Sequence, residues 1–309
     1  MKFRLTKNQK RISLFFFFAV IAGICFFVKT RLPVIHERKV HKKIAFAAIP
    51  INAPIKPRMT GPVVTIPAPS FKKRLGAFRP MRTFHSSSPK IVIVLDDIGH
   101  TTENLELLRA LGNQVTYAIL PFLKHTAFFD EFSFQTGAEV ILHMPLESIR
   151  GTIPGPGLIL TGMSDQEALD ILRRSLASVP HAQGANNHMG SKGSADIRLM
   201  TLLLKEFKRS DLFFLDSMTT PESVSRTVAS SINFPSSLKR DVFLDNTDTQ
   251  DAVRFQIGDL ASIARQHGYA VGIGHYRYNT LKVLSEEIPR LKKDGYEFIS
   301  LQELLRFKK

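Results

Sequence analysis

Short apolar segments alternate with amphipathic helical segments from Lys90 to the C-terminus, and no other feature constrains the fold as strongly. The segments predicted to be strands are 90–95, 115–120, 139–143, 184–188, 212–215, 241–244, 270–274 and 297–299. Helical patterns separate them, such as the one that Ser164 caps, with Glu167 completing a capping box. This alternation predicts an α/β domain with a parallel sheet covered by helices, most economically a (β/α) barrel. An open doubly wound sheet is the competing topology.

The turn after the first predicted strand argues against a nucleotide-binding fold. It reads Asp96-Asp97-Ile98-Gly99, at the place where nucleotide-binding folds carry a glycine-rich phosphate loop. The polar residues at the strand ends therefore indicate a chemistry other than nucleotide binding.

Polar side chains stand at the carboxyl ends of the predicted strands. They are Asp96 and Asp97, His143, His188, Asp216, Asp245 and His275. In a parallel barrel these ends lie on one face, which is where such barrels build active sites. Because burying charged groups is costly unless they are paired or bind a metal, we expect a functional cluster there.

These residue types predict a site for a divalent metal ion. One of the two adjacent carboxylates can bind the metal while its neighbour serves as base. His143 and His188, together with one aspartate, make a three-ligand site that leaves positions for water, as hydrolytic zinc sites do. Glu147, four residues after His143, is an alternative ligand. Further candidate contacts to metal or substrate are Asp216, Asp245, Asn187 and Ser191.

The basic charge of the chain is concentrated in its first 89 residues. This arm holds 18 of the 42 lysines and arginines but only one of the 27 acidic residues, Glu37. The formal charge of +15 therefore describes a basic arm on a nearly neutral domain. The arm lacks aromatic residues interleaved with its basic ones and contains an apolar run, so we expect no nucleic-acid partner.

Residues 12–28 form an uncharged apolar run between basic residues. A helix of this length covers about 25 Å, close to the ~30 Å hydrocarbon core of a bilayer. Because no good small-residue cleavage pattern follows the run, an uncleaved signal anchor is favoured over a cleaved signal peptide. We expect the membrane to be one partner of the chain and the folded domain to lie outside the cytoplasm.

Four regions follow from this reading: a basic stub (1–11), a transmembrane signal anchor (12–28), a linker (29–89) and a folded domain (90–309). The linker contains nine of the 17 prolines and is strongly basic, which predicts an extended spacer. The single cysteine, Cys25, lies in the anchor. An internal disulfide and a cysteine-based zinc cluster are therefore excluded, and a metal in the domain needs His, Asp or Glu.

Seven motifs of the domain, taken in order, resemble those of a known family. They are Ile-Val-Leu-Asp-Asp-Ile-Gly (93–99), Tyr-Ala-Ile-Leu-Pro (117–121), Glu-Val-Ile-Leu-His-Met-Pro-Leu-Glu (139–147), Asn-Asn-His-Met-Gly-Ser (186–191), Phe-Leu-Asp-Ser (214–217), Phe-Leu-Asp-Asn (243–246) and Ile-Gly-His (273–275). Together they resemble the divergent polysaccharide deacetylases, an envelope-associated bacterial branch of the NodB-like carbohydrate esterases.

The resemblance implies a NodB-like (β/α)7 barrel and metal-dependent removal of acyl groups from a polysaccharide. It implies that Asp96 is the catalytic base, Asp97 a metal ligand and His275 the acid that protonates the leaving amine. NodB-like enzymes take two ligands from one His-x-x-x-His motif, whereas this chain has His143 followed by Glu147. Either Glu147 replaces the second histidine or His188 supplies the ligand from the next strand, and the neutral imidazole of His188 suits zinc better.

The expected function is thus a hydrolase, dependent on a divalent metal such as Zn²⁺, that removes N- or O-acetyl groups from an envelope polysaccharide. The expected location is the bacterial inner membrane, with a single span and the domain in the periplasm. A catalytically inactive glycan-binding or envelope-scaffold protein with the same barrel is the alternative.

Overall fold

The computed structural model describes residues 88–308. The predicted stub (1–11), the predicted anchor (12–28) and all but the last two residues of the predicted linker lie outside this range. Within residues 88–308, no helix combines the length and the apolar character that crossing a membrane requires.

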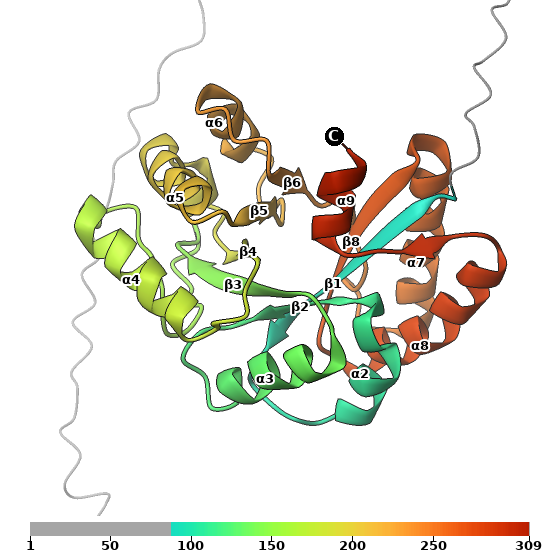
Figure 1. The fold of residues 1–309 in the computed structure, drawn as a ribbon. Helices are drawn as coiled ribbons and strands as arrows, with labels where there is room; N and C mark the ends of the chain where they lie inside the picture. Colours follow the sequence, from blue (N-terminus) through green and yellow to red (C-terminus); the bar gives the residue numbers. More distant parts are fainter. Residues whose placement is uncertain (1–87, 309) are drawn as a thin grey trace, which may run out of the picture. The chain divides into compact units, whose positions relative to one another are not determined.

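The described strands form one parallel sheet (Figure 1). They are β1 (Lys90–Ile98), β2 (Thr116–Ile119), β3 (Val140–Leu146), β4 (Gly184–Met189), β5 (Phe213–Asp216), β6 (Ser237–Lys239), β7 (Val242–Phe243), β8 (Tyr269–His275) and β9 (Glu297–Phe298). Their order is β6-β5-β4-β3-β2-β1-β8-β7, with β9 also paired to β1. The prediction of a parallel α/β fold is confirmed. Since β1 to β6 lie side by side in chain order, the sheet is wound in one direction, and the doubly wound alternative is wrong.

The sheet curls into a half-barrel and is not closed by hydrogen bonds all the way round. Its edges are β6 and β7, which the chain connects through only Arg240 and Asp241. The amide of Arg240 still donates to Asp216 beside β6, whereas the amide of Asp241 donates to Val271 of β8. One extended segment therefore leaves one edge and joins the other. Two parallel strands need a long crossover connection to pair, so β6 and β7 do not pair, and the predicted closed barrel is corrected to a curled sheet with a seam.

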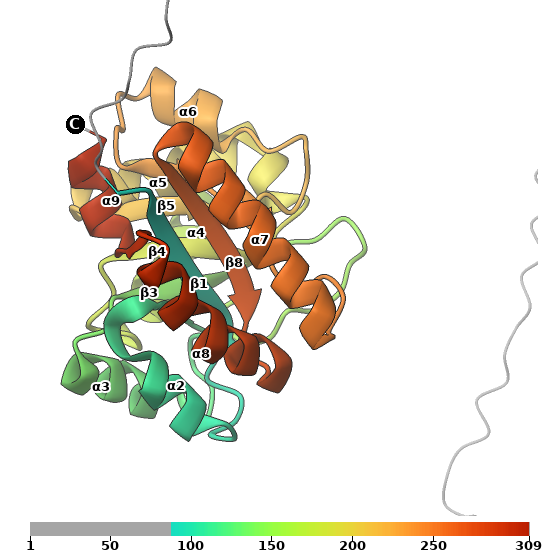
Figure 2. The ribbon, with the colours of Figure 1, turned by 90° about the vertical axis from the view of Figure 1, so that its right-hand side faces the viewer.

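Helices cover the convex side of the sheet, as Figures 1 and 2 show. They are α2 (Leu105–Leu111), α3 (Thr126–Thr136), α4 (Asp165–Ala177), α5 (Ile197–Arg209), α6 (Ser225–Ser231), α7 (Gln250–His267) and α8 (Tyr278–Lys293), with short 3₁₀ turns at Gly112–Gln114 and Gly193–Ala195. The predicted capping box of Ser164 and Glu167 is present at the start of α4. The last helix, α9 (Leu301–Phe307), instead lies on the concave side (Figure 1).

The alternation of side chains along β1 separates two apolar layers. Ile91, Ile93 and Leu95 belong to the outer core beneath the helices. Val92 and Val94 point inwards and belong to a smaller core that includes Leu301 and Leu304 of α9.

Helix α9 therefore closes the amino-terminal end of the curled sheet. The buried carboxylate of Glu139 accepts hydrogen bonds from the amides of Leu301 and Gln302 and holds the start of this helix in place. The polar side chains that continue the inner face beyond the apolar layer lie at the carboxyl ends of the strands.

Candidate metal centre

A β-bulge brings the two adjacent aspartates to the same end of β1. Leu95 pairs with Tyr117 of β2 and Ile98 with Ile119, so two residues of β1 face one residue of β2. Asp97 lies in this bulge and has a left-handed backbone conformation, with a φ angle of 63°. Such a conformation is uncommon outside glycine and recurs at functional sites. In a regular strand the two carboxylates would point to opposite faces, whereas here both interact with His143.

Asp97, His143 and His188 come together as a compact set of three donors. Nε2 of His143 lies 3.1 Å from Oδ1 of Asp97, and Nδ1 of His188 lies 3.0 Å from the same oxygen. The two imidazole nitrogens are 3.0 Å apart. Nitrogen and oxygen ligands held about 2.0–2.2 Å from one metal ion lie about 3–3.5 Å apart, depending on the coordination geometry. The three side chains therefore fit one face of the coordination sphere of a divalent ion.

The backbone after His188 turns sharply, which lets this residue reach the cluster from the end of β4. Met189 and Gly190 both have left-handed φ angles, 52° and 87°. A Cβ atom on Gly190 would lie 2.9 Å from the Cβ of Leu146, so only glycine fits this close approach to β3.

Asn186 links the second carboxylate to the donor set. It lies two residues before His188 on β4 and is fully buried. Its Nδ2 donates to Oδ1 of Asp96 at 2.8 Å, and its Oδ1 accepts from Nδ1 of His143 at 2.8 Å. Asp96 is thereby held next to the donor set without being part of it.

His275 stands across the cluster from His143, at the end of β8. It pairs with Asp96 along the β1–β8 ladder, and its Nε2 lies 3.8 Å from Oδ2 of Asp97. Its Nδ1 donates to Oδ1 of the buried Asp245 at 2.9 Å. Asp245 also accepts from the hydroxyl of Thr280 at 2.6 Å. This arrangement fixes the imidazole with Nε2 directed towards the cluster.

The cluster carries more negative charge than a protein interior tolerates without compensation. Burial raises the pKa of Asp96, against the opposing effects of His143 and Asn186. Burial also disfavours the charged form of Asp97, but hydrogen bonds from His143 and His188 outweigh it and hold its pKa well below the usual range. Burial works against a proton on His143, yet Asp96 and Asp97 raise its pKa to about 9. The two carboxylates thus favour positive charge between them, which a proton or a metal cation can supply.

The two other histidines of the cluster shift in opposite directions. Burial, assisted by the neighbouring His143, lowers the pKa of His188 and favours the neutral imidazole that metal binding requires. Burial also disfavours the cationic form of His275, but the hydrogen bond between His275 and Asp245 outweighs the effect of burial and raises the pKa of His275.

Several residues singled out in the sequence lie outside this cluster. Glu147 accepts from Lys192 at 2.7 Å and, through its other oxygen, from the hydroxyl of Thr161 at 2.6 Å. Its carboxylate therefore joins two loops and is not brought to the donor set. The hydroxyl of Ser191 likewise accepts from the amide of Ile149 in a neighbouring loop.

Asp216 and Asn187 shape the loop after β5. Asp216 accepts from the amide of Met218 at 2.8 Å and from the hydroxyl of Ser223 at 2.6 Å. Asn187 accepts from the amide of Ser217 and donates to the carbonyl of Met189. Neither side chain joins the donor set.

Sequence reasoning missed Asn186, although it quoted the motif that contains it. The signal was available in the two-residue period of a strand, because Asn186 shares a face with His188. It also gave no role to Thr280 behind Asp245, whereas Ser217, expected to be an orienting hydroxyl, accepts from Asn186 at 3.2 Å.

Comparison with known proteins agrees with the motifs. Residues 93–305 match the family model described as divergent polysaccharide deacetylase, and this span contains all seven motifs. An uncharacterized protein of Haemophilus influenzae is 32% identical over 212 residues, which cover 69% of this chain and 75% of that protein. The uncharacterized protein YibQ of Escherichia coli is 29% identical over 226 residues, covering 72% of this chain and 70% of that protein. The resemblance stated from the motifs is therefore confirmed.

A solved structure shares the fold. The crystal structure of the uncharacterized protein ATU2773 from Agrobacterium tumefaciens C58 superposes with a TM-score of 0.67 and 24% sequence identity. The match covers 71% of this chain and 90% of that one. This likeness concerns the fold alone.

Proposed function

Because the chain belongs to the divergent polysaccharide deacetylase family, we propose that its domain is a metal-dependent hydrolase that removes N- or O-acetyl groups from an envelope polysaccharide. The observation that carries the proposal is the close set of Asp97, His143 and His188 beside two further groups suited to proton transfer. Such a set allows water to attack a carbonyl without a serine or cysteine nucleophile.

The donor set is one that zinc uses. Two imidazole nitrogens and one carboxylate oxygen are typical of catalytic zinc sites, in which three protein ligands leave a position open. A divalent ion held by these residues would lower the pKa of a bound water to about 7 and would polarise the acetyl carbonyl.

The chain's own residues then move two protons. Asp96, held by Asn186 next to the donor set, accepts the proton of the attacking water. His275 donates a proton from Nε2 to the nitrogen or oxygen of the sugar as the bond from this atom to the acetyl carbon breaks. The acetyl group is then released as acetate. Asp245 stabilises the positive imidazole of His275 through Nδ1 and keeps Nε2 turned towards the reaction. Each such proton transfer contributes about 10²–10⁴-fold to the rate.

The proposal places the reaction on the outer side of the bacterial inner membrane. Its support is the uncharged run at residues 12–28 and the basic, proline-rich segment that follows. A polysaccharide of the envelope would be within reach of a domain exported in this way.

The test measures metal content and acetate release together. The purified full-length chain, its Asp97→Asn variant and its Asp96→Asn variant are each stripped with a chelator, reloaded with Zn²⁺ and incubated with N-acetylglucosamine oligosaccharides and with O-acetylated oligosaccharides. Asp251→Asn, an exposed position in the first turn of α7, serves as the matched control.

We expect the wild type and Asp251→Asn to bind one Zn²⁺ and to release acetate in a chelator-sensitive reaction. Asp97→Asn should lose both properties, whereas Asp96→Asn should keep the metal and react about 10²–10⁴-fold more slowly. A wild-type chain that holds no stoichiometric metal would overturn the proposal. Metal and glycan binding without acetate release would favour the non-catalytic glycan-binding alternative.

A further inference from the structure

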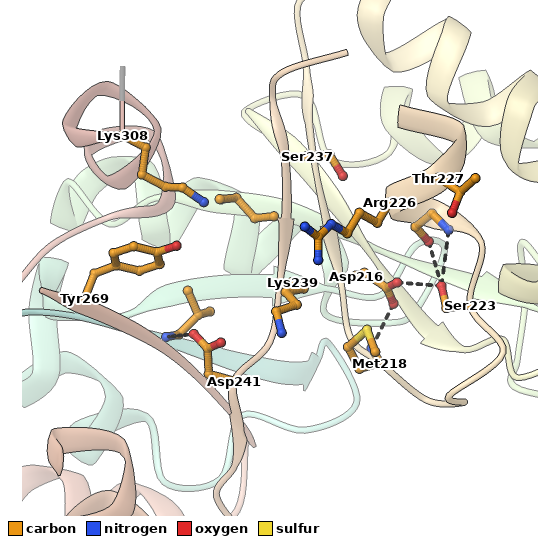
Figure 3. A pocket seen from close by; sticks show the side chains of 13 residues that line it. Asp216, Met218, Ser223, Arg226, Thr227, Ser237, Lys239, Asp241, Tyr269 and Lys308 are labelled. Carbon is orange, nitrogen blue, oxygen red and sulfur yellow. Dashed lines mark hydrogen bonds between the residues drawn. The ribbon is translucent and has the colours of Figure 1, made fainter. Parts of the chain in front are cut away.

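A cavity of about 500 Å³ lies at the seam of the sheet, and the proposed reaction does not use it (Figure 3). Residues of α6, β6, β8 and the end of α9 line it. It exists because the chain leaves β6 after Lys239 and joins the opposite edge, so that no strand fills the space between β6 and the start of β8. Its volume is within the range of about 300–1,000 Å³ typical of ligand sites.

Three cationic side chains from three parts of the chain line this seam cavity. Arg226 comes from α6, Lys239 from β6 and Lys308 from the residue after α9. In Figure 3 the head groups of Arg226 and Lys308 approach the cavity from opposite sides. None of the three forms a salt bridge within the described part of the chain. Their mutual repulsion is a reason for this site to attract an anion.

The two carboxylates on the wall are already engaged by the chain itself. Asp216 accepts from Met218 and Ser223, and Asp241 accepts from the amide of Val271 at 2.9 Å. These bonds come from neutral groups and fix the two carboxylates in the wall without discharging them, so the three cations of the seam cavity exceed its two anions by one positive charge.

The rest of the wall suits a sugar ring. Thr227 and Ser237 contribute hydroxyl groups, and Tyr269 contributes a phenolic hydroxyl, while the ammonium group of Lys308 lies over its ring, 4.9 Å from the centroid. Leu238 and Val271 add apolar surface. A pyranose offers hydroxyls around its edge and C–H groups on its faces, and a wall of this mixed character matches both.

We propose that the seam cavity binds an anionic sugar unit, one that carries a carboxylate or a phosphate group. Arg226, Lys239 and Lys308 hold the anionic group, and the hydroxyl groups hold the ring. The inference rests on the proposed function in one respect: the unit belongs to the polysaccharide that is deacetylated. Asp216 of the cavity wall is followed in the chain by Ser217, whose hydroxyl accepts a hydrogen bond from Asn186. The wall of the seam cavity is therefore connected to the proposed catalytic cluster through one peptide bond and the side chain of Asn186.

The experiment measures binding and not turnover, so its outcome is independent of the deacetylase test. The full-length chain is titrated calorimetrically with N-acetylglucosamine 6-phosphate and with glucuronic acid, at low and at physiological ionic strength. Uncharged N-acetylglucosamine and inorganic phosphate are the comparison probes. The double variant Arg226→Gln/Lys239→Gln is compared with Lys292→Gln/Lys293→Gln, which removes the same charge from exposed positions of α8 outside the cavity.

We expect at least one anionic sugar to bind about tenfold or more tightly than both comparison probes, with an affinity that falls as salt is added. The Arg226→Gln/Lys239→Gln variant should lose about tenfold in affinity, since charge-assisted hydrogen bonds are removed, while the α8 variant and Asp97→Asn should bind as the wild type does. Equal binding of the neutral sugar would overturn the role of charge, and equal binding of inorganic phosphate would overturn the role of the sugar ring. Unchanged affinity in Arg226→Gln/Lys239→Gln, or loss of binding in Asp97→Asn, would show that the sugar is held elsewhere.

Discussion

Asn186 determines which nitrogen of His143 is available to a metal ion. Its Nδ2 faces the carboxylate of Asp96, which can only accept, so its Oδ1 must face Nδ1 of His143. That nitrogen therefore keeps its proton, and Nε2, which faces Asp97 and His188, is the nitrogen whose proton a metal ion would replace. One amide side chain thus orients both the proposed metal ligand, His143, and the proposed base, Asp96.

Two substitutions of Asn186 separate these roles. Asn186→Leu removes both hydrogen bonds and should weaken metal binding and slow acetate release, each by about 10–100-fold. Asn186→Asp keeps an acceptor for His143 but places a second carboxylate against Asp96, so it should retain the metal and still lose activity. Metal affinity by chelator competition and kcat for acetate release are the measurements.

Asn113→Ala, in an exposed turn, is the control for Asn186. Far-UV circular dichroism checks that each variant is folded. If Asn186→Leu binds zinc and turns over like the control, Asn186 does not position His143.

The identity of the third ligand can be decided by two substitutions, one of His188 and one of Glu147. His188→Gln should lose stoichiometric zinc, because His188 lies 3.0 Å from both other donor atoms. Glu147→Gln should keep it, because Glu147 is engaged by Lys192 and Thr161. Zinc content after dialysis, measured by mass spectrometry, distinguishes the two. The opposite pattern would mean that Glu147, and not His188, completes the site.

At the scale of elements, α4 and α5 are joined by a carboxylate clamped between two arginines. The carboxylate of the buried Glu206 accepts from Arg173 of α4 at 2.9 Å and from Arg209 of its own helix at 2.6 Å. Hydrogen bonds from Arg209 and then Arg173 lower the pKa of Glu206 from its ordinary 4.5 to about 2. The carboxylate is thus held in its charged form by the fold.

Acid should weaken this clamp in a defined pH window. Because the pKa is lower in the folded than in the unfolded chain, the stabilisation is complete above pH 4.5 and is lost as the pH falls from about 4.5 to about 2. Glu206→Gln should lower the free energy of unfolding at pH 7 by on the order of 1 kcal/mol, since the largely exposed arginines are screened by solvent. It should also reduce the pH dependence within this window. Urea unfolding between pH 7 and pH 2 measures both effects.

The control for this prediction is Glu131→Gln, the same change at an exposed position of α3. It should leave the acid dependence of stability as it is in the wild type. Parallel pH profiles for Glu206→Gln and the wild type would contradict the clamp.

At the scale of the whole molecule, the curled sheet is filled by α9 at one end and carries the cluster of aspartates and histidines at the other. Leu301 and Leu304 of α9 fill the amino-terminal end, and the inner side chains of β1, β3 and β8 change from apolar to Asp or His at the carboxyl end. Residue 90 enters the domain at the closed end, where it pairs with β9. The cluster therefore lies at the carboxyl ends of the strands, at the end opposite α9.

The membrane anchor proposed for residues 12–28 makes a prediction for the full chain. The protein should remain in the membrane pellet after alkaline extraction, with its unprocessed mass of 34.7 kDa. Proteases added to spheroplasts should digest residues 90–309. Phe16→Lys/Phe17→Lys should release the protein from the pellet, since charges at the centre of a span cost about 2.5–3.5 kcal/mol each. A wild-type chain that is extracted at alkaline pH, or a domain that is protected from protease, would contradict the proposal.

Local patterns in the sequence were enough to predict the parallel α/β fold and the residues that end its strands. Apolar runs, helix periods and the Ser164 capping box act over a few residues, and the parallel arrangement follows from them. The grouping of Asp97, His143 and His188 could be anticipated, because the carboxyl ends of parallel strands meet on one face.

The tertiary structure determined which strands are neighbours and which face of the sheet each side chain occupies. It separated Glu147 from the donor set, gave Asn186 its place between Asp96 and His143, and directed Asp245 to His275. It also opened the seam, because two residues between β6 and β7 are too few for a parallel crossover. The contacts of Glu147, Asp245 and Asn186 join residues 14 to 90 positions apart, and local sequence patterns do not specify such contacts.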